Sequence, residues 1–350
     1  MEKQATIRDV AKLAGVSLAT ASRALNDPDY PVRAQLRQRV RDAAAQLDYV
    51  PNAMARSLRR EFNRDVGLII PNISNPFYLQ AMLGINDVLA KNDHCIILCN
   101  TMRDPAQERN YLRQLYERQT RGVILSSVDE SAEAVKEYAR KGMKFVFLDQ
   151  KLTGIESVGI HFDSCGGARM AVEHLISLGH RQIAFGTMPM TRWTRQEMHR
   201  GYCDALLAAG LPYDTKLIYE RTPTARDMNT DLELAAGQAI ARAFLDDGCP
   251  ATAMLCNNDM VAMGVIQTLL KDGVRVPEDV SVFGFDDIPI ASAFAPALTT
   301  VHYPAAETGR LAALMMLDML SKNATEMSIT MNLTPHLVLR DTVAPPKGAE

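Results

Sequence analysis

The sequence lacks the features that are typical of a secreted, membrane-bound or metal-binding protein. Its 350 residues include six cysteines, and no two of them form a Cys-x-x-Cys pair. The N-terminus carries no apolar signal segment, and no apolar run is long enough to span a bilayer. We therefore expect reduced thiols, no metal, no membrane association and a cytoplasmic location.

The common catalytic motifs are also missing. His-Glu-x-x-His, a Walker-type Gly-Lys-Ser/Thr loop, Gly-x-Gly-x-x-Gly and Gly-x-Ser-x-Gly do not occur. These motifs hold metals, phosphates, dinucleotides or a nucleophile in place. Their absence argues against an enzyme, and we expect no catalytic residue and no cofactor.

Charge is distributed unevenly along the chain, whose net charge is −3. Residues 1–64 contain 12 Lys and Arg against 7 Asp and Glu, a balance of +5, whereas the remainder carries −8. A basic N-terminal part on an acidic body indicates that only the first part meets a polyanion such as DNA. Chance segregation of charge is the alternative.

The N-terminal residues have the pattern of a helix-turn-helix. Ile7, Val10, Leu13 and Ala14 recur at helical spacing and give one helix an apolar face. Gly15 permits a sharp turn, and Ser17 is a candidate N-cap for a second short helix. The outward side chains of that second helix would then reach base edges and phosphates.

The rest of the chain alternates short apolar runs with helical periods. Strands are expected over 66–70, 95–99, 123–125, 145–148, 183–185, 217–219, 253–256 and 280–284. Helices are expected over 34–47, 77–90, 108–119, 168–178, 199–209, 234–245 and 260–270. This alternation predicts an α/β body of doubly wound parallel sheets, and the number of elements suits two lobes with a ligand cleft between them. The expected organisation is a helix-turn-helix head over 1–50, a hinge helix and linker over 51–65, a two-lobed body over 66–340 and a disordered tail over 341–350.

Ordered motifs along nearly the whole chain resemble the lactose/galactose repressor family of bacterial transcription regulators. In the head and linker these are T-I-R-D-V-A-K-L-A-G-V-S from Thr6, T-A-S-R-A-L-N ending at Asn26, and Y-x-P-N-x-x-A-R-S-L from Tyr49 to Leu58. In the body they are Asn75-Pro-Phe, Phe147-Leu-Asp, Glu173–Arg181, Gly201-Tyr, Asn258–Gly264, Gly284–Ile288 and Pro296–Thr300.

The resemblance implies a repressor with a periplasmic-binding-protein-like body. Two heads of a homodimer would bind a pseudo-palindromic double-stranded operator, and a small sugar-like effector in the body would change the lobe arrangement. Whether that effector releases DNA or promotes binding stays open. The sequence lacks a C-terminal leucine heptad, so we expect a dimer and not a zipper-built tetramer. A sugar-binding transport protein and a sugar-handling enzyme are the alternatives; the head argues against the first and the missing motifs against the second.

In the head, the resemblance assigns DNA contacts to the second helix. Arg23 matches a guanine-reading arginine, with a phosphate contact as the alternative. The family positions that hold phosphates are occupied here by Ser17, Thr20, Ser22 and Asn26, each of which would equally suit a cap or a polar surface.

Apolar side chains occupy the base-reading and hinge positions. Leu18 and Ala19 match the family's variable base-reading positions, where they would contact thymine methyl groups, unless Leu18 packs on the head. Leu58 matches the leucine inserted into the minor groove, with the small Ala55 allowing two hinge helices to approach. The alternative for Leu58 is a buried leucine that ties the linker to the body.

In the body, the resemblance assigns effector contacts to seven residues. These are Asn75, Phe77, Asp149, Phe162, Thr194, Asn258 and Asp286. The two carboxylates would each bind sugar hydroxyls, and a helix cap is the alternative for an aspartate that follows a strand.

One position departs from the family pattern. Family members with sugar or purine effectors commonly carry an arginine three residues before the Gly-Tyr pair, where this chain has Met198. Arg192, Arg195 and Arg200 lie nearby, but none is in register. The departure makes a plain pentose or purine less expected than another sugar, a sugar acid or a phosphorylated sugar. Trp193 would either stack on a sugar face or pack on the lobe surface.

Overall fold

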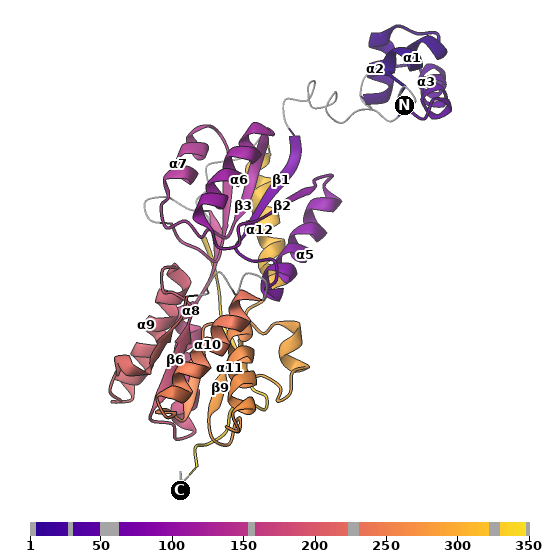
Figure 1. The fold of residues 1–350 in the computed structure, drawn as a ribbon. Coiled ribbons are helices and arrows are strands. Elements are labelled where there is room, and N and C mark those ends of the chain that lie inside the picture. Colours follow the sequence, from indigo (N-terminus) through magenta and orange to yellow (C-terminus); the bar gives the residue numbers. More distant parts are fainter. Residues whose placement is uncertain are drawn as a thin grey trace. The chain divides into compact units, whose positions relative to one another are not determined.

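The computed structural model describes residues 5–26, 31–49, 63–152, 158–222, 231–321 and 330–347. The chain divides into an N-terminal unit, Met1–Asn63, and a larger unit, Arg64–Glu350 (Figure 1). We call them the head and the body and describe each separately.

The head contains three short helices around a small apolar core. They are α1 (Ile7–Leu13), α2 (Leu18–Asn26) and α3 (Ala34–Gln46). Their packing leaves Val10, Ala21 and Val40 without exposed surface. Gly15 turns the chain between α1 and α2 with a φ of 63°, a conformation that suits glycine. The helix-turn-helix expected from the apolar spacing is therefore present, but Leu13, expected on the apolar face of α1, is 47% exposed and lies outside this core.

The first lobe of the body is built on a six-stranded sheet of order β11-β5-β4-β3-β1-β2. Its strands are β1 (Asn63–Ile70), β2 (Ile96–Asn100), β3 (Thr120–Leu125), β4 (Lys144–Leu148), β5 (Gly159–Phe162) and β11 (Thr330–Leu333). Its helices are α5 (Pro76–Lys91), α6 (Pro105–Glu117), α7 (Glu133–Arg140) and α12 (Ala305–Leu320). Successive residues of β1 face opposite sides: Leu68 packs with the α5 side and Ile69 with the α6 side. Both faces are buried, which explains the continuous apolar runs.

The second lobe is built on a four-stranded parallel sheet of order β7-β6-β8-β9. Its strands are β6 (Ile183–Thr187), β7 (Ile218–Glu220), β8 (Ala253–Cys256) and β9 (Ser281–Phe283). Its helices are α8 (Ser164–Ser177), α9 (Trp193–Ala208), α10 (Leu232–Asp246) and α11 (Asp259–Lys271). The short strands β10 (Thr300–His302) and β12 (His336–Val338) pair antiparallel beside it.

The chain passes between the lobes more than once. It leaves the first lobe after β5, returns after β10 to form α12, and leaves again after β11. Figure 1 shows α12 beside α5 in the first lobe, although more than two hundred residues separate them in sequence. The doubly wound two-lobed body expected from the sequence is thus confirmed, with lobes that are discontinuous in sequence.

The structure differs from the sequence-based expectations in two ways. First, it contains four strands that were not expected, β5, β10, β11 and β12, because each has only three or four residues and no distinct alternation of apolar and polar residues. Second, the expectation of a disordered tail over 341–350 is wrong for residues 341–347. Thr342 is fully buried, donates to the carbonyl oxygen of Val282 (2.7 Å) and accepts from the amide of Thr299 (2.9 Å).

Glycines allow α5 and α12 to approach closely. A Cβ atom added to Gly309 would lie 1.9 Å from the backbone oxygen of Ala81, and one added to Gly84 would lie 1.9 Å from that of Ala306. Backbone atoms cannot move aside as a flexible side chain can, so only glycine fits either position.

Gly309→Ala should lower the free energy of unfolding of the body by about 1–3 kcal/mol, because the added methyl group forces α12 away from α5. Urea unfolding at fixed protein concentration measures the change. Asp318→Ala, an exposed position on the same helix, should cost no more than about 0.5 kcal/mol. Equal stability of Gly309→Ala and the wild type would contradict the close approach.

Candidate functional site

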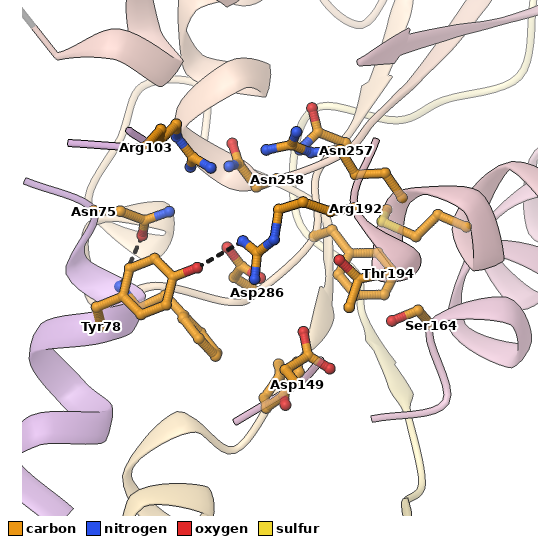
Figure 2. A pocket seen from close by; sticks show the side chains of 15 residues that line it. Asn75, Tyr78, Arg103, Asp149, Ser164, Arg192, Thr194, Asn257, Asn258 and Asp286 are labelled. Carbon is orange, nitrogen blue, oxygen red and sulfur yellow. Dashed lines mark hydrogen bonds between the residues drawn. The ribbon is translucent and has the colours of Figure 1, made fainter. Parts of the chain in front are cut away.

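A narrow cavity of about 60 Å³ lies in the body where side chains of both lobes meet. Figure 2 shows the side chains that line it. They are Asn75, Phe77, Tyr78, Arg103, Asp149, Ser164, Arg192, Thr194, Arg195, Met198, Asn257, Asn258, Phe285, Asp286 and Tyr303. Many of these residues immediately follow a strand or begin a helix, the usual position of ligand sites in parallel α/β sheets.

The cavity brings together six of the seven residues expected to hold an effector. Those six are Asn75, Phe77, Asp149, Thr194, Asn258 and Asp286. The seventh, Phe162, is 1% exposed and stacks on Tyr303 with ring centroids 4.2 Å apart. Tyr303 lines the cavity itself, so the structure places Phe162 behind it, as a support for the ring that faces the cavity.

The two asparagines also cap helices. The Asn75 side chain accepts from the amide of Phe77 (2.9 Å) at the start of α5. The Asn258 side chain accepts from the amide of Val261 (2.8 Å) at the start of α11. Capping therefore fixes the orientation of both amides toward the cavity.

The two aspartates do not cap helices. Asp149 follows β4 with a φ of 47°, and Asp286 follows β9 with a φ of 124°. Non-glycine residues rarely adopt these conformations, and such strain is concentrated at binding sites. The helix-cap interpretation of these carboxylates is thus excluded by their geometry.

Burial disfavours the ionised form of both aspartates. It raises the pKa of Asp149 to about 6, while the nearby Arg192 opposes the rise. Burial, followed by repulsion from Asp259 and Asp149, raises the pKa of Asp286 well above its usual range. Asp286 therefore favours the protonated form, which donates a hydrogen bond as well as accepting one.

Arginine side chains join the two lobes. Arg192, just before α9, donates to the hydroxyl oxygens of Tyr78 and Ser126 in the first lobe, each at 3.0 Å. Figure 2 shows the bond to Tyr78. Arg103 of the first lobe forms an ion pair with Glu233 near the start of α10 in the second. Glu233 is fully buried and also accepts from the side chain of Asn72 (2.7 Å).

The sequence pattern did not predict that Arg103, Arg192 and Arg195 line one cavity. Arg103 and Glu233 are 130 residues apart, and Glu233 in the first turn of a helix looks like an ordinary acidic residue at a helix N-terminus. Arg192 and Arg195 were considered only as replacements for the missing arginine. Both line the cavity, as does Met198.

Two other side chains near α9 lie outside the lining. Arg200 is exposed and pairs with Glu197. Trp193 packs edge-on against His161 with ring centroids 5.5 Å apart, so the structure favours packing over sugar stacking.

A wider cavity of about 350 Å³ adjoins the first and shares Phe77, Asp286 and Tyr303 with it. The rest of its lining includes Pro289, Pro304 and neighbouring residues at the lobe crossing. We place the candidate site in the first cavity, because polar groups from both lobes converge there.

The head presents α2 with three of its expected DNA-contacting side chains exposed. Leu18 is 45% exposed, and Ala19 and Arg23 are exposed as well. The Ser17 hydroxyl accepts from the amide of Thr20 (3.1 Å), which is an N-cap interaction. Exposure of Leu18 excludes its burial in the head core.

The remaining expected contacts are less accessible or not described. Ser22 is 8% exposed, and Asn26 is the last residue of α2. Ala55 and Leu58 lie outside the described residues, so the hinge stays a prediction from the sequence.

Comparison with known proteins identifies both parts of the chain. Residues 6–52 match the profile of bacterial regulatory proteins of the lacI family, and residues 172–343 match the periplasmic binding protein-like domain. The chain is 31% identical over 343 residues to the HTH-type transcriptional repressor PurR of Aliivibrio fischeri, covering 97% of this chain and 98% of that protein. It is also 31% identical over 339 residues to the ribose operon repressor of Haemophilus influenzae, covering 97% and 98%.

The chain belongs to the LacI family.

Solved structures agree with this assignment. The lac repressor dimer bound to operator and the anti-inducer ONPF matches with a TM-score of 0.83 and 26% identity, covering 98% of this chain and all of that one. The transcriptional regulator CelR in complex with cellobiose matches with a TM-score of 0.71 and 28% identity, covering 97% and 99%. This LacI-family chain is therefore a bacterial transcription regulator with a helix-turn-helix head and a two-lobed body.

The described parts of this LacI-family protein reveal no metal centre and no membrane span. Across the described ranges, no three His, Cys, Asp or Glu side chains come together in a way that would hold a metal ion. Every described helix is too short or too polar to cross a bilayer.

Compared with the wild type, Asp149→Asn should stabilise the ligand-free body more at pH 7.5 than at pH 4.5. Because the folded-state pKa is raised from 3.8 to about 6, the wild type loses stability as the pH rises through this interval and Asp149 ionises. The neutral amide avoids that loss, so the variant's advantage should grow by about 1–3 kcal/mol between the two pH values. Urea unfolding at both pH values measures it.

Asp318→Asn, an exposed change on α12, is the control and should show no such pH-dependent gain. An advantage of Asp149→Asn that is the same at both pH values would mean that Asp149 titrates normally.

Proposed function

We propose that this protein is a homodimeric repressor whose affinity for a pseudo-palindromic operator is controlled by a small, sugar-like metabolite bound in the body cavity. The observation that supports this most strongly is the cavity itself, whose polar lining comes from both lobes of the body. A metabolite that contacts both lobes stabilises one lobe arrangement over another, which is the requirement for ligand control of a distant site.

DNA recognition rests on the exposed surface of α2. Arg23 matches the arginine expected to read a guanine, and the exposed apolar pair Leu18 and Ala19 suits thymine methyl groups. A homodimer presents two such helices to two half-sites, which explains why the operator is expected to be two-fold symmetric.

The relatives support repression as the effect of DNA binding on transcription. PurR and the ribose operon repressor are named as repressors, and they match this chain over nearly its full length. The protein acts in this scheme by binding alone, without catalysis, and from the cytoplasm.

The scheme is tested in two steps with the full-length protein. Selection from random double-stranded DNA should yield a two-fold symmetric site, and sedimentation should show a dimer on it. A thermal-shift screen against sugars, sugar acids, sugar phosphates and purines should then find a compound that changes affinity for that site. A compound at one hundred times its dissociation constant stabilises the protein by about 2.7 kcal/mol, a readily measured shift. Failure to select any DNA sequence would contradict the proposal.

Arg23→Ala should weaken binding to the selected operator by about 1–3 kcal/mol and lower discrimination at one guanine position. Arg41→Ala, an exposed arginine on α3, is the matched control and should affect specific and non-specific DNA alike. Fluorescence anisotropy with both kinds of DNA separates the two effects. Uniform weakening by Arg23→Ala would show that Arg23 contacts phosphate.

Exchanging A·T for G·C beneath Leu18 and Ala19 should also reduce affinity, because the thymine methyl contacts are lost. The same anisotropy assay applies, with an exchange outside the half-sites as the control. Unchanged affinity would mean that this pair does not read bases.

A further inference from the structure

Three guanidinium groups share the body cavity, and only one of them has a carboxylate partner. Arg103 pairs with the buried Glu233. Arg192 donates instead to the two neutral hydroxyls of Tyr78 and Ser126. Within the described part of the chain, no carboxylate oxygen is in ion-pair contact with Arg192 or Arg195.

Arg195 is the least compensated of the three. It is 6% exposed, and its guanidinium donates to the carbonyl oxygen of Pro189 (2.8 Å) and contacts the Sδ of Met188 (3.8 Å), both of which are neutral. Burial lowers its pKa well below the usual value, and repulsion from Arg103 and Arg192 adds to the effect. A buried cation in this position lowers stability until an anion neutralises it.

Buried arginine N–H groups without a hydrogen-bond partner also indicate that the cavity suits an anion. Arg192 is 9% exposed, and its Nε atom is buried without a hydrogen-bond partner among the described residues. The Nε atom of Arg103 is buried and unpartnered in the same way. Each unpartnered charged donor adds a desolvation cost that a ligand oxygen would remove.

The cavity aspartates supply only part of the missing negative charge. Asp286 favours its protonated form, whereas Asp149, whose pKa is about 6, ionises near neutral pH and offsets part of the charge of Arg192. Neither aspartate forms an ion pair with Arg195 among the described residues. In Figure 2, Arg103 lies at the upper left and Asp149 below the centre of the view, with the guanidinium group of Arg192 between them. The lining thus combines a cationic part with a part that suits hydroxyl groups.

We propose that the effector is a polyhydroxy acid of monosaccharide size. Its anionic group, a carboxylate or a phosphate, binds Arg192 and Arg195, and its hydroxyl groups bind Asp149 and Asp286. This inference rests on the proposed function, because it assigns the chemistry of the effector in the same cavity. The cavity is smaller than a monosaccharide, so the ligand displaces side chains on entry, including the bonds of Arg192 to Tyr78 and Ser126.

Calorimetry with the full-length protein and matched ligand pairs tests the proposal. The pairs are D-gluconate and D-glucuronate against D-glucose, D-galacturonate against D-galactose, and D-ribonate against D-ribose. Glucose 6-phosphate and inorganic phosphate form a separate arm that distinguishes a phosphoryl group from a carboxylate. At least one anionic sugar derivative should bind, at least tenfold more tightly than its neutral partner.

Arg195→Met should weaken binding of that acid by about 10- to 100-fold, which is the loss expected for a charge-assisted contact. The ligand-free variant should melt at a higher temperature than the wild type, because an uncompensated buried cation is removed. Arg200→Met, an exposed arginine on the same helix, should change neither quantity. A merely structural Arg195 would give the opposite result: a lower melting temperature and unchanged affinity.

The outcomes separate this inference from the proposed function. If a neutral sugar binds as tightly as its acid and Arg195→Met binds both, the effector is not an anion, although the regulator scheme stands. If no anionic compound binds while the protein still binds its selected operator, the inference is wrong and DNA recognition is unaffected. If no operator can be selected at all, the proposed function fails first.

Discussion

The burial of charge where the lobes meet is the constraint on which the body of this protein depends. Arg192, Arg195 and Glu233 of the second lobe are buried there beside the half-buried Arg103 of the first, and each must find a partner or carry a desolvation cost. The pair Arg103–Glu233 and the hydrogen bonds of Arg192 to the first lobe meet part of that requirement. The same contacts cross between the lobes, so any ligand that replaces them also changes how strongly the lobes are held together.

The fold around this site explains why charges meet there. Parallel sheets place the carboxyl ends of their strands at one edge, and both lobes turn that edge toward the cavity. Strand ends also release the chain from the extended conformation, which allows the left-handed geometry of Asp149 and Asp286. The close pairing of α5 with α12, which requires Gly84 and Gly309, fixes the position of Asn75 and Phe77 at the start of α5.

Local sequence signals predicted the framework of the fold well. Strands buried on both faces are continuous apolar runs, and the expected strand over 253–256 coincides with β8. The expected start of α11 was one residue from the observed one, after the cap Asn258, but the expected start of α8 was four residues late although Asp163 caps that helix. The signals failed for β11 and for the tail around Thr342, since both owe their order to partners far away in the sequence. Neither segment has a periodicity of its own that would have indicated that order.

In the candidate site, too, the sequence predicted what local signals mark and missed what depends on contacts between distant parts of the chain. Motif matching located Asn75, Asn258 and the two aspartates, because each stands at a helix start or strand end that the chain itself marks. It missed the pairing of Arg103 with Glu233, which depends on packing between elements 130 residues apart. From the missing arginine at Met198 it inferred only that a plain pentose or purine is less expected as the effector, and it left open whether Arg192, Arg195 or Arg200 takes that arginine's place. The folded chain answers that question, because Arg192, just before α9, and Arg195, in its first turn, line the cavity together with Met198, whereas Arg200 does not.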